Sequence, residues 1–326
     1  MVQEFGPPEV LRTVEVPDPV PGPGEALVDV AAADVLWVET AVRGGEGTDW
    51  FPHRPPYVPG NGVAGTVTAV GDRVDPGWVG RTVAGHTGNL GGYAERAAIP
   101  VERLVPVPDG VSAEQAAALL HDGPTALALF DHLRVGADDA VLVVGASGGL
   151  GLLSVQLARR RADRVVAVAR DPAKIARIRA LGPDAVVDSD DPDWPAAARA
   201  ALPPAGADVV LDNVGGPLGR PALDLVAPGG RHSAHGTPAG GFAVVDENEA
   251  RRRGITSSGI EVVQMSPDRL TEHLRRALDA AADGTLHPVI GQSFPLDRAA
   301  DAHAAIEART VFGKTLLTAG TVPPQR

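Results

Sequence analysis

The stretch AVLVVGASGGLGLLSVQLARRRADRVVAVARDPAK, residues 140–174, decides the fold. It opens with the apolar run Val141 to Val144, which is short and β-branched and therefore predicts a buried parallel strand. A glycine-rich turn follows, then leucines at helical spacing, and then a second apolar run from Arg164 to Val168. This order predicts one strand, turn, helix and strand unit.

The turn has the pattern Ala146-x-Gly148-x-x-Gly151. Glycines in such a turn let the chain reverse tightly, let a pyrophosphate approach the backbone, and let the helix pack closely on the strand. Amides at the start of the helix also attract phosphate, because they lie at the positive end of its dipole. The residues expected to bind a dinucleotide are Ser147, Gly148, Gly149 and Leu150. A purely structural tight turn is the alternative interpretation.

The end of the second strand discriminates between two dinucleotides. An NAD site needs Asp or Glu there to bind the ribose hydroxyls, whereas the 2′-phosphate of NADPH needs cations. Here Arg170 follows Ala169 directly, and Lys174 returns alongside on the next helix. These two cations predict NADPH, and a solvated helix start is the alternative. Asp171 is expected to cap that helix rather than to bind ribose.

Length, charge and cysteine content limit the classes of function. The 326 residues suffice for about two domains. A net charge of −12 argues against nucleic acid or an anionic membrane as the main partner. The chain has no cysteine, which removes disulfides and thiolate zinc sites and fits a reducing cytoplasm. It has no apolar run of ~20 residues and no signal peptide, so we predict a cytoplasmic protein without a membrane segment.

The alternation of apolar runs and turns changes along the chain. Short strands and turns between Val2 and Ile99 indicate a small barrel. Beyond Lys174, strands and helices alternate as far as Ala234, which indicates a doubly wound parallel sheet. Residues 255–263 are expected to be extended. The predicted fold is α/β, with residues 1–120 and 257–326 in the domain that contains the barrel and 121–256 in a nucleotide-binding domain.

Motifs distributed over nearly the whole chain resemble those of one enzyme superfamily. They are Phe5-Gly6-Pro7-Pro8-Glu9-Val10-Leu11, Pro59-Gly60-Asn61-Gly62-Val63-Ala64-Gly65, Gly71-Asp72-Arg73-Val74, Gly91-Gly92-Tyr93-Ala94-Glu95, Gly123-Pro124-Thr125-Ala126, the nucleotide turn, Asp212-Asn213-Val214-Gly215-Gly216 and Gly229-Gly230-Arg231. Together they resemble the medium-chain dehydrogenase/reductase superfamily, in its zinc-free quinone oxidoreductase and enoyl reductase-like branch. The resemblance implies a GroES-like β-barrel catalytic domain split around a Rossmann domain, with the active site in the cleft between them.

The resemblance also implies where the cofactor and any zinc would lie. The expected further cofactor contacts are Thr125, Asn213, Val214, Gly215, His235, Gly236 and Lys314, with a surface role as the alternative for Lys314. Relatives that bind zinc carry a His-Glu pair near the position of Gly60 and several cysteines. This chain has Asn61 and Gly62 there and no cysteine, so no metal is expected. His232 and His235 are three apart on a strand and form a poor ligand pair.

The substrate end departs from the pattern of the branch. Leu36 and Ala41 stand where related quinone reductases have Asn and Tyr, which predicts a more apolar pocket. The expected substrate-pocket residues are Leu36, Trp37, Ala41, Trp50, Phe51, Tyr57 and His86. The alternative is that the aromatic residues belong to the barrel core.

These observations predict hydride transfer from NADPH to a quinone or an α,β-unsaturated carbonyl, with the protein orienting the substrate and excluding water. Asn61 and His121 are the candidate catalytic residues, the latter because an ordinary histidine pKa lies in the working range. A structural helix-end histidine is the alternative for His121.

Two other functions stay open on sequence grounds. One is a tailoring reductase acting on a larger apolar, polyketide-like substrate, and the other is a non-catalytic NADPH-binding sensor or structural protein. By analogy with relatives, residues 255–263 are expected to extend a neighbour's sheet edge and so form a homodimer.

Overall fold

The computed structural model describes residues 1–47, 51–88 and 90–320, and the chain divides into two compact units. Unit 1 consists of Met1–Pro124 and Pro267–Arg326, and unit 2 of Thr125–Ser266. Both boundaries lie further along the chain than the predicted ones. The first is shifted because Gly123 packs in unit 1, where a Cβ on it would lie 2.7 Å from the Cβ of Ala277.

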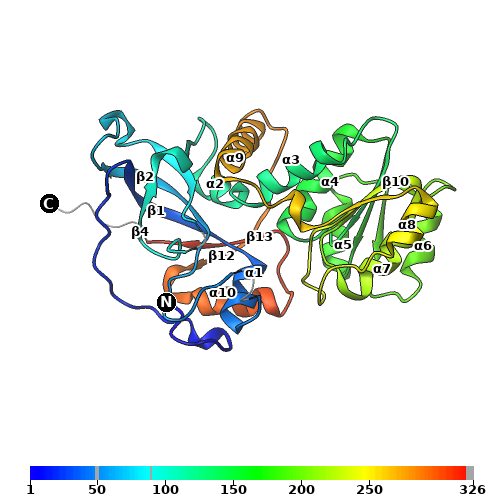
Figure 1. The fold of residues 1–326 in the computed structure, drawn as a ribbon, viewed down its shortest axis with the longest axis horizontal. Helices are drawn as coiled ribbons and strands as arrows, with labels where there is room; N and C mark the ends of the chain where they lie inside the picture. Colours follow the sequence, from blue (N-terminus) through cyan, green and yellow to red (C-terminus); the bar gives the residue numbers. More distant parts are fainter. Residues whose placement is uncertain (48–50, 89, 321–326) are drawn as a thin grey trace. The chain divides into compact units, whose positions relative to one another are not determined.

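The sheet of unit 1 is organised around β1 (Glu25–Val35), drawn in blue in Figure 1. This strand pairs antiparallel with β2 (Gly62–Val70), β4 (Arg96–Pro100) and β13 (Lys314–Thr318). The order is β12-β13-β1-β2-β3-β5, with β4 also against β1. The remaining strands are β3 (Thr82–His86), β5 (Leu104–Pro106) and β12 (Ile290–Pro295). The last strand of the chain therefore lies beside the first.

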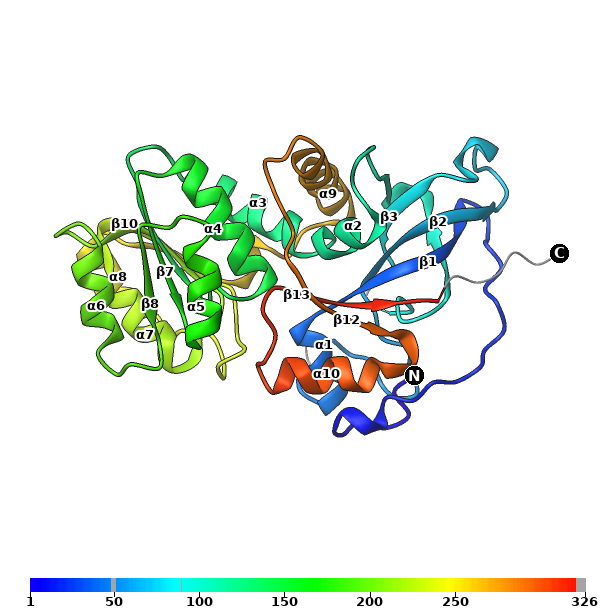
Figure 2. The same cartoon turned by 180° about the vertical axis from the view of Figure 1, so that it is seen from behind.

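Four helices accompany this sheet: α1 (Trp37–Gly44), α2 (Ala113–Leu119), α9 (Pro267–Ala282) and α10 (Ala299–Glu307). Helix α2 begins with a serine cap, because the Ser112 hydroxyl accepts the Gln115 N–H at 3.2 Å and the Gln115 side chain accepts the Ser112 N–H. Helices α1 and α10 are in contact, as Figures 1 and 2 show. Their apolar faces close over the core of unit 1 around Val42, Val28 and Ala302.

Unit 2 is a six-stranded parallel sheet in the order β11-β10-β9-β6-β7-β8. The strands are β6 (Ala140–Val144), β7 (Arg164–Ala169), β8 (Ala185–Asp188), β9 (Ala207–Asp212), β10 (Val226–Ala234) and β11 (Thr256–Ser258). Strand β6 is buried throughout, as a strand covered on both faces requires. The predicted doubly wound parallel sheet is confirmed.

Six helices occur between Asp122 and Arg253. They are α3 (Asp122–His132), α4 (Gly149–Arg161), α5 (Pro172–Arg179), α6 (Trp194–Ala201), α7 (Gly216–Asp224) and α8 (Glu247–Arg253). Within unit 2, α4 and α5 cover one face of the sheet, and α6 to α8 cover the other (Figures 1 and 2). Right-handed crossovers produce this division, because the strand order reverses direction after β8.

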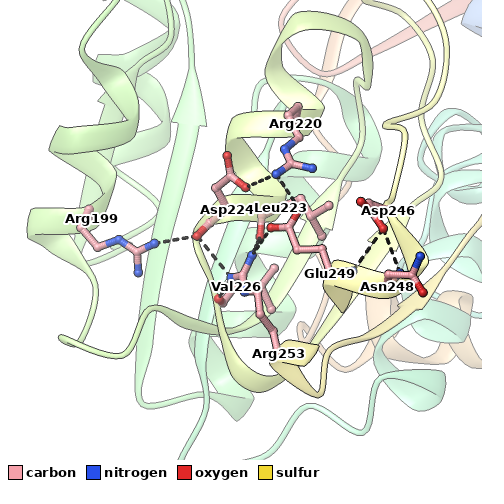
Figure 3. A network of polar contacts seen from close by, with 9 residues as sticks. All are labelled: Arg199, Arg220, Leu223, Asp224, Val226, Asp246, Asn248, Glu249 and Arg253. Atoms are coloured by element: carbon pink, nitrogen blue, oxygen red, sulfur yellow. Dashed lines mark hydrogen bonds and ion pairs between the residues drawn. The ribbon is translucent and has the colours of Figure 1, made fainter. Parts of the chain in front are cut away.

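Three arginines hold the carboxyl end of α7 (Figure 3). Arg199 donates to the Asp224 carbonyl oxygen at 2.7 Å, and Arg253 donates to the carbonyl oxygens of Leu223 and Val226. Arg220 contacts the carboxylates of Asp224 at 3.0 Å and Glu249 at 2.8 Å. Helix α8 begins at Asp246, whose carboxylate accepts the N–H groups of Asn248 and Glu249. Orphan carbonyls at the end of α7 are thus paired by cations that complement the helix dipole.

The prediction for residues 255–263 is only partly correct. Strand β11 covers Thr256–Ser258 and a 3₁₀ turn follows at Ile260–Val262. The chain turns there because the Gly259 N–H donates to the Glu261 carboxylate at 2.7 Å, which closes a local loop. Among the described residues, no helix is both long and apolar enough to cross a bilayer.

Gly151 and Gly148 provide a test of the strand-to-helix turn. A Cβ on Gly151 would lie 2.3 Å from the Gly145 carbonyl oxygen, whereas nothing lies within 4 Å of one on Gly148. Gly151→Ala is therefore expected to lower the free energy of unfolding by about 1–3 kcal/mol, as overpacking does. Denaturant unfolding measures this, with Gly148→Ala as the matched control. Equal stability of the two variants would contradict the packing argument.

Candidate functional site

A pocket in unit 1 lies between α1 and the segment that leads to β2. It is partly open to solvent and is lined by Val38, Glu39, Val42, Phe51, His53, Tyr57, Pro59 and Asn61. Val38 and Val42 share one face of α1, because they are four residues apart. The pocket therefore has an apolar side from the helix and a mixed side from the following segment.

Three buried polar atoms at this pocket have no hydrogen-bond partner within the described part of the chain. They are Glu39 Oε1, His53 Nε2 and the Tyr57 hydroxyl. A buried polar atom without a partner costs about 1–3 kcal/mol. Apolar walls with a few unpaired polar atoms are typical of a site that binds a small oxygen-bearing molecule.

The second carboxyl oxygen of Glu39, Oε2, accepts two hydrogen bonds that hold the side chain in place. Glu39 Oε2 accepts the Leu36 N–H at 2.9 Å and the Tyr93 hydroxyl at 2.8 Å. Burial and the nearby Asp34 carboxylate raise the pKa of Glu39 to about 8. The Tyr93 hydroxyl also lies 3.0 Å from His303 Nε2. Since that hydroxyl donates to Glu39, His303 Nε2 must be the donor in the second bond.

A buried lysine joins three segments of unit 1. Lys314 Nζ lies 3.5 Å from Asp34 Oδ2 and 3.4 Å from Asp122 Oδ1. Burial opposes the charge of Lys314, yet Asp122 and Asp34 outweigh it and raise the pKa of the ammonium. Burial raises the pKa of Asp34 to about 6, although Lys314 opposes this. Lys314 therefore forms its ion pairs with carboxylates of its own unit. Its contact with a cofactor stays a prediction.

The nucleotide turn of unit 2 offers both space and donors. Gly148 precedes α4 without capping it through a side chain, and the Gly148 position is open. Amides in the first turn of a helix lack partners within the helix. The backbone of Gly149 and Leu150 is therefore suited to a phosphate group.

The two predicted phosphate cations are neighbours. Arg170 is half-buried after β7, and Lys174 is buried in the first turn of α5. Burial lowers the pKa of Lys174, with Arg170 contributing in the same direction and Asp171 opposing. The Asp171 carboxylate accepts the N–H groups of Ala173 and Lys174, so its predicted capping role is confirmed. An anion beside Arg170 and Lys174 would offset the repulsion between them.

The carboxyl ends of β6, β9 and β10 are tied together by side chains. The Asn213 amide donates to the Val144 carbonyl oxygen at 2.8 Å, and Asn213 Oδ1 lies 2.9 Å from His235 Nε2. His235 Nε2 is therefore the donor, and Nδ1 accepts the Ser233 hydroxyl at 3.1 Å. Burial lowers the pKa of His235 to about 4, so its ring is neutral near pH 7.

Three of the other predicted contacts in unit 2, Val214, Gly215 and Gly236, lie in the same region. Gly236 packs directly on Asn213, because a Cβ on it would lie 1.8 Å from the Asn213 carbonyl oxygen. Gly215 has φ +63°, and its N–H donates to Asp212 Oδ1 at 2.8 Å. Val214 is half-buried and Thr125 is buried. The two glycines are required by close backbone approach, and their part in binding a cofactor stays a prediction.

Two known protein families match parts of this chain. The alcohol dehydrogenase GroES-like domain family matches residues 22–109, and the zinc-binding dehydrogenase family matches residues 181–317. Quinone oxidoreductase from Mus musculus is 30% identical over 311 residues, covering 94% of this chain and 92% of the mouse protein. The chain belongs to the medium-chain dehydrogenase/reductase superfamily. The predicted GroES-like and Rossmann architecture is confirmed.

Other members of this superfamily show the same similarity. Quinone oxidoreductase from Pseudomonas aeruginosa is 30% identical, covering 96% of this chain and 97% of that protein. The crystal structure of Escherichia coli quinone oxidoreductase complexed with NADPH has a TM-score of 0.88 and 25% identity, covering 97% of this chain and 98% of that one. This chain is therefore an oxidoreductase of the quinone oxidoreductase type within the medium-chain dehydrogenase/reductase superfamily.

The pocket contains only part of the predicted substrate site of this medium-chain dehydrogenase/reductase. Phe51, Tyr57 and Asn61 line it, and Trp50 lies outside the described residues. The predicted residues that do not line it are Leu36, Trp37, Ala41 and His86. Leu36 is buried where α1 begins, and its N–H donates a hydrogen bond to the Glu39 carboxyl group. His86 is buried on β3, where burial lowers its pKa to about 3.

His121 does not have the pKa that the sequence suggested. Burial, together with the nearby Lys314 charge, lowers its pKa to about 4, although Asp122 opposes this. The ring is therefore neutral near pH 7, and His121 does not line the pocket. The expectation of a pKa in the working range is corrected, because the sequence alone did not reveal that the ring is buried and lies near the Lys314 charge. Its catalytic role stays untested.

The sequence did not indicate Glu39, and it indicated His53 only as a weaker candidate than His121. Glu39 follows Leu36 by three residues, which reads as a helix-capping carboxyl, and His53 reads as a loop histidine. The available signal was the helical spacing of residues 38, 39 and 42, which places Glu39 beside an apolar face. Although one matching family is named for zinc, the described residues contain no group of three or more His, Cys, Asp or Glu placed to hold a metal ion.

Replacement of Lys314 tests the buried charge cluster. Lys314→Met leaves Asp34 and Asp122 buried without their cation, which is expected to cost about 3–5 kcal/mol of unfolding free energy at pH 8. The loss should be smaller at pH 5, because protonation of Asp34 removes one uncompensated charge. Denaturant unfolding at both pH values measures this. An equal loss at pH 5 and pH 8 would contradict the electrostatic explanation.

Proposed function

We propose that this chain is an NADPH-dependent reductase that transfers hydride, without zinc, to a quinone or an α,β-unsaturated carbonyl compound. The pocket of unit 1 carries the proposal, because its apolar walls and unpaired polar atoms suit a small oxygen-bearing acceptor. The named relatives are quinone oxidoreductases, and one is complexed with NADPH.

The residues proposed to hold the cofactor are those predicted from the sequence. The backbone of Gly149 and Leu150 would bind the pyrophosphate, with Ser147 beside it, and Arg170 and Lys174 would bind the 2′-phosphate. The proposed nicotinamide contacts are Thr125, Asn213, Val214, Gly215, His235, Gly236 and Lys314. When bound, this cofactor supplies the hydride.

The protein contributes orientation and electrostatic stabilisation. The Tyr57 hydroxyl and the amide of Asn61 would donate hydrogen bonds to the acceptor oxygen on which negative charge develops. Val38, Val42 and Phe51 would exclude water from that oxygen, which strengthens these hydrogen bonds. No observation favours a non-catalytic sensor.

The first experiment measures cofactor binding and turnover. NADPH is expected to bind more tightly than NADH by fluorescence titration, and a panel of quinones and enones should then oxidise the bound NADPH. Treatment with a metal chelator should leave the rate unchanged. Tight NADPH binding without oxidation by any acceptor would contradict the reductase, and tighter binding of NADH would contradict the 2′-phosphate assignment.

Arg170→Ala tests the coenzyme preference. Losing a charge-assisted hydrogen bond to the 2′-phosphate should raise the Kd for NADPH about tenfold or more, since such bonds contribute about 1.5–3 kcal/mol. The Kd for NADH, which lacks that phosphate, should not change. Arg179→Ala, which replaces an exposed arginine at the end of the following helix α5, is the control. An equal effect on both coenzymes would show that Arg170 acts on the fold.

We also propose a homodimer, formed through the sheet edge at β11. Strand β11 pairs with β10 on one side, and it ends the strand order of its sheet. Sedimentation analysis of the purified chain is expected to give twice the mass of 33.4 kDa. A single 33.4 kDa species at micromolar concentration would refute the dimer.

A further inference from the structure

The two oxygens of the Glu39 carboxyl group have different surroundings. Oε2 accepts two hydrogen bonds, from the Leu36 N–H and the Tyr93 hydroxyl, and Oε1 has no partner among the described residues. An oxygen that accepts two donors has no room for a proton of its own. A proton on the carboxyl group therefore belongs on Oε1, which makes Oε1 a hydrogen-bond donor.

Glu39 also belongs to the pocket that the proposed function assigns to the acceptor. It lies on α1 among Val38, Val42 and Phe51, so an acceptor in the pocket would meet its carboxyl group in an apolar setting. Tyr57 and His53 line the same pocket, and the Tyr57 hydroxyl and His53 Nε2 are buried without a partner among the described residues. The pocket therefore brings an acidic O–H together with further polar atoms suited to one ligand oxygen.

Several charged and titratable groups act on this carboxyl group. Asp34 raises the pKa of Glu39 and adds to the larger effect of burial, whereas Tyr93 and Lys314 lower it. The balance puts the pKa at about 8, so Glu39 holds its proton at neutral pH. The groups that face Glu39 or its immediate neighbours are Asp34, Arg43, His53, Tyr57, Tyr93, His303 and Lys314.

We propose that Glu39 is the catalytic acid of this pocket and delivers the Oε1 proton to the oxygen of the bound quinone or enone. This inference rests on the proposed reductase function. The acceptor gains a hydride at carbon and becomes an oxyanion. The Glu39 O–H bond then breaks and a new O–H bond forms on the acceptor. An enone gives an enol, and a quinone gives the dienone tautomer of a hydroquinone, which becomes the hydroquinone when its added ring-carbon hydrogen leaves as a proton and the second oxygen gains one. Two electrons arrive with the hydride and none with the proton, so the step balances.

The surroundings of Glu39 stabilise the carboxylate that remains. Its Oε2 keeps the two donors, Leu36 N–H and Tyr93 O–H, and the Lys314 ammonium compensates part of the new charge. A proton from water restores the acid after product leaves. Tyr93 is a positioning residue in this scheme, because its hydroxyl donates to Oε2 and not to the acceptor. His303 Nε2 donates to the Tyr93 hydroxyl and so orients it.

Glu39→Gln is the first test, because glutamine keeps an oxygen that can accept the Leu36 N–H. We expect kcat for acceptor reduction to fall about 100-fold or more, the usual contribution of a general acid. The Kd for NADPH should stay within about twofold. Wild-type kcat should fall as the pH rises through about 8, since the acid must be protonated. The kcat of the variant should not show this fall with pH. Glu46→Gln, an exposed glutamate just beyond α1, is the matched control.

Infrared difference spectra give a readout that needs neither cofactor nor acceptor. Wild type minus Glu39→Gln should show the C=O band of a protonated carboxyl group at pH 7, and the band should disappear as the pH rises through about 8. Tyr93→Phe removes a hydrogen bond that lowers the pKa of Glu39. The loss of the C=O band and the fall of kcat should therefore both occur at higher pH than in the wild type. A purely structural tyrosine would leave them in place.

The outcomes separate this inference from the function on which it rests. A wild-type chain that binds NADPH but reduces no acceptor overturns the reductase proposal, and the role of Glu39 with it. An active wild type with an equally active Glu39→Gln variant overturns the role of Glu39 alone. Absence of the carboxyl band at pH 7 does the same, because an ionised Glu39 has no proton to deliver.

Discussion

The buried ion pairs of Lys314 are the constraint on which unit 1 depends. The lysine comes from the last strand, Asp34 from the first, and Asp122 from the start of α3, so residues far apart in the chain meet at one charge. Removing such charges from water is costly, and the pairs offset that cost only when all three segments are in place. The cluster therefore ties the return of the chain after unit 2 to the correct assembly of unit 1.

The same charges set the chemistry of the neighbouring pocket. Asp34 raises the pKa of Glu39 while Lys314 lowers it, and Lys314 also keeps His121 neutral. Of the two groups, the carboxylic acid can hold a proton near pH 7 and the imidazole cannot. Burial is the main cause in both cases, and it acts in opposite directions because it disfavours the anion of an acid and the cation of a base.

Unit 2 achieves its geometry by different means, through close backbone approach. Gly151 allows α4 to lie against Gly145, and Gly236 allows the chain after β10 to lie against Asn213. His235, held neutral by burial, then links Ser233 to Asn213 across neighbouring strand ends. Close packing and hydrogen bonds thus support the backbone around the nucleotide turn and the neighbouring strand ends, and such support reduces the conformational entropy that binding must overcome.

The sequence by itself determined the doubly wound sheet, its glycine turn, the cap at Asp171, and the superfamily. These depend on local periodicity, on turns and on short motifs, whose physical meaning lies within a few consecutive residues. Only the tertiary structure decided that Glu39, His53 and Tyr57 share a pocket, that Lys314 is an interior cation, and that His121 is neutral. Those properties depend on burial and on charges contributed by distant segments, and no local pattern encodes either.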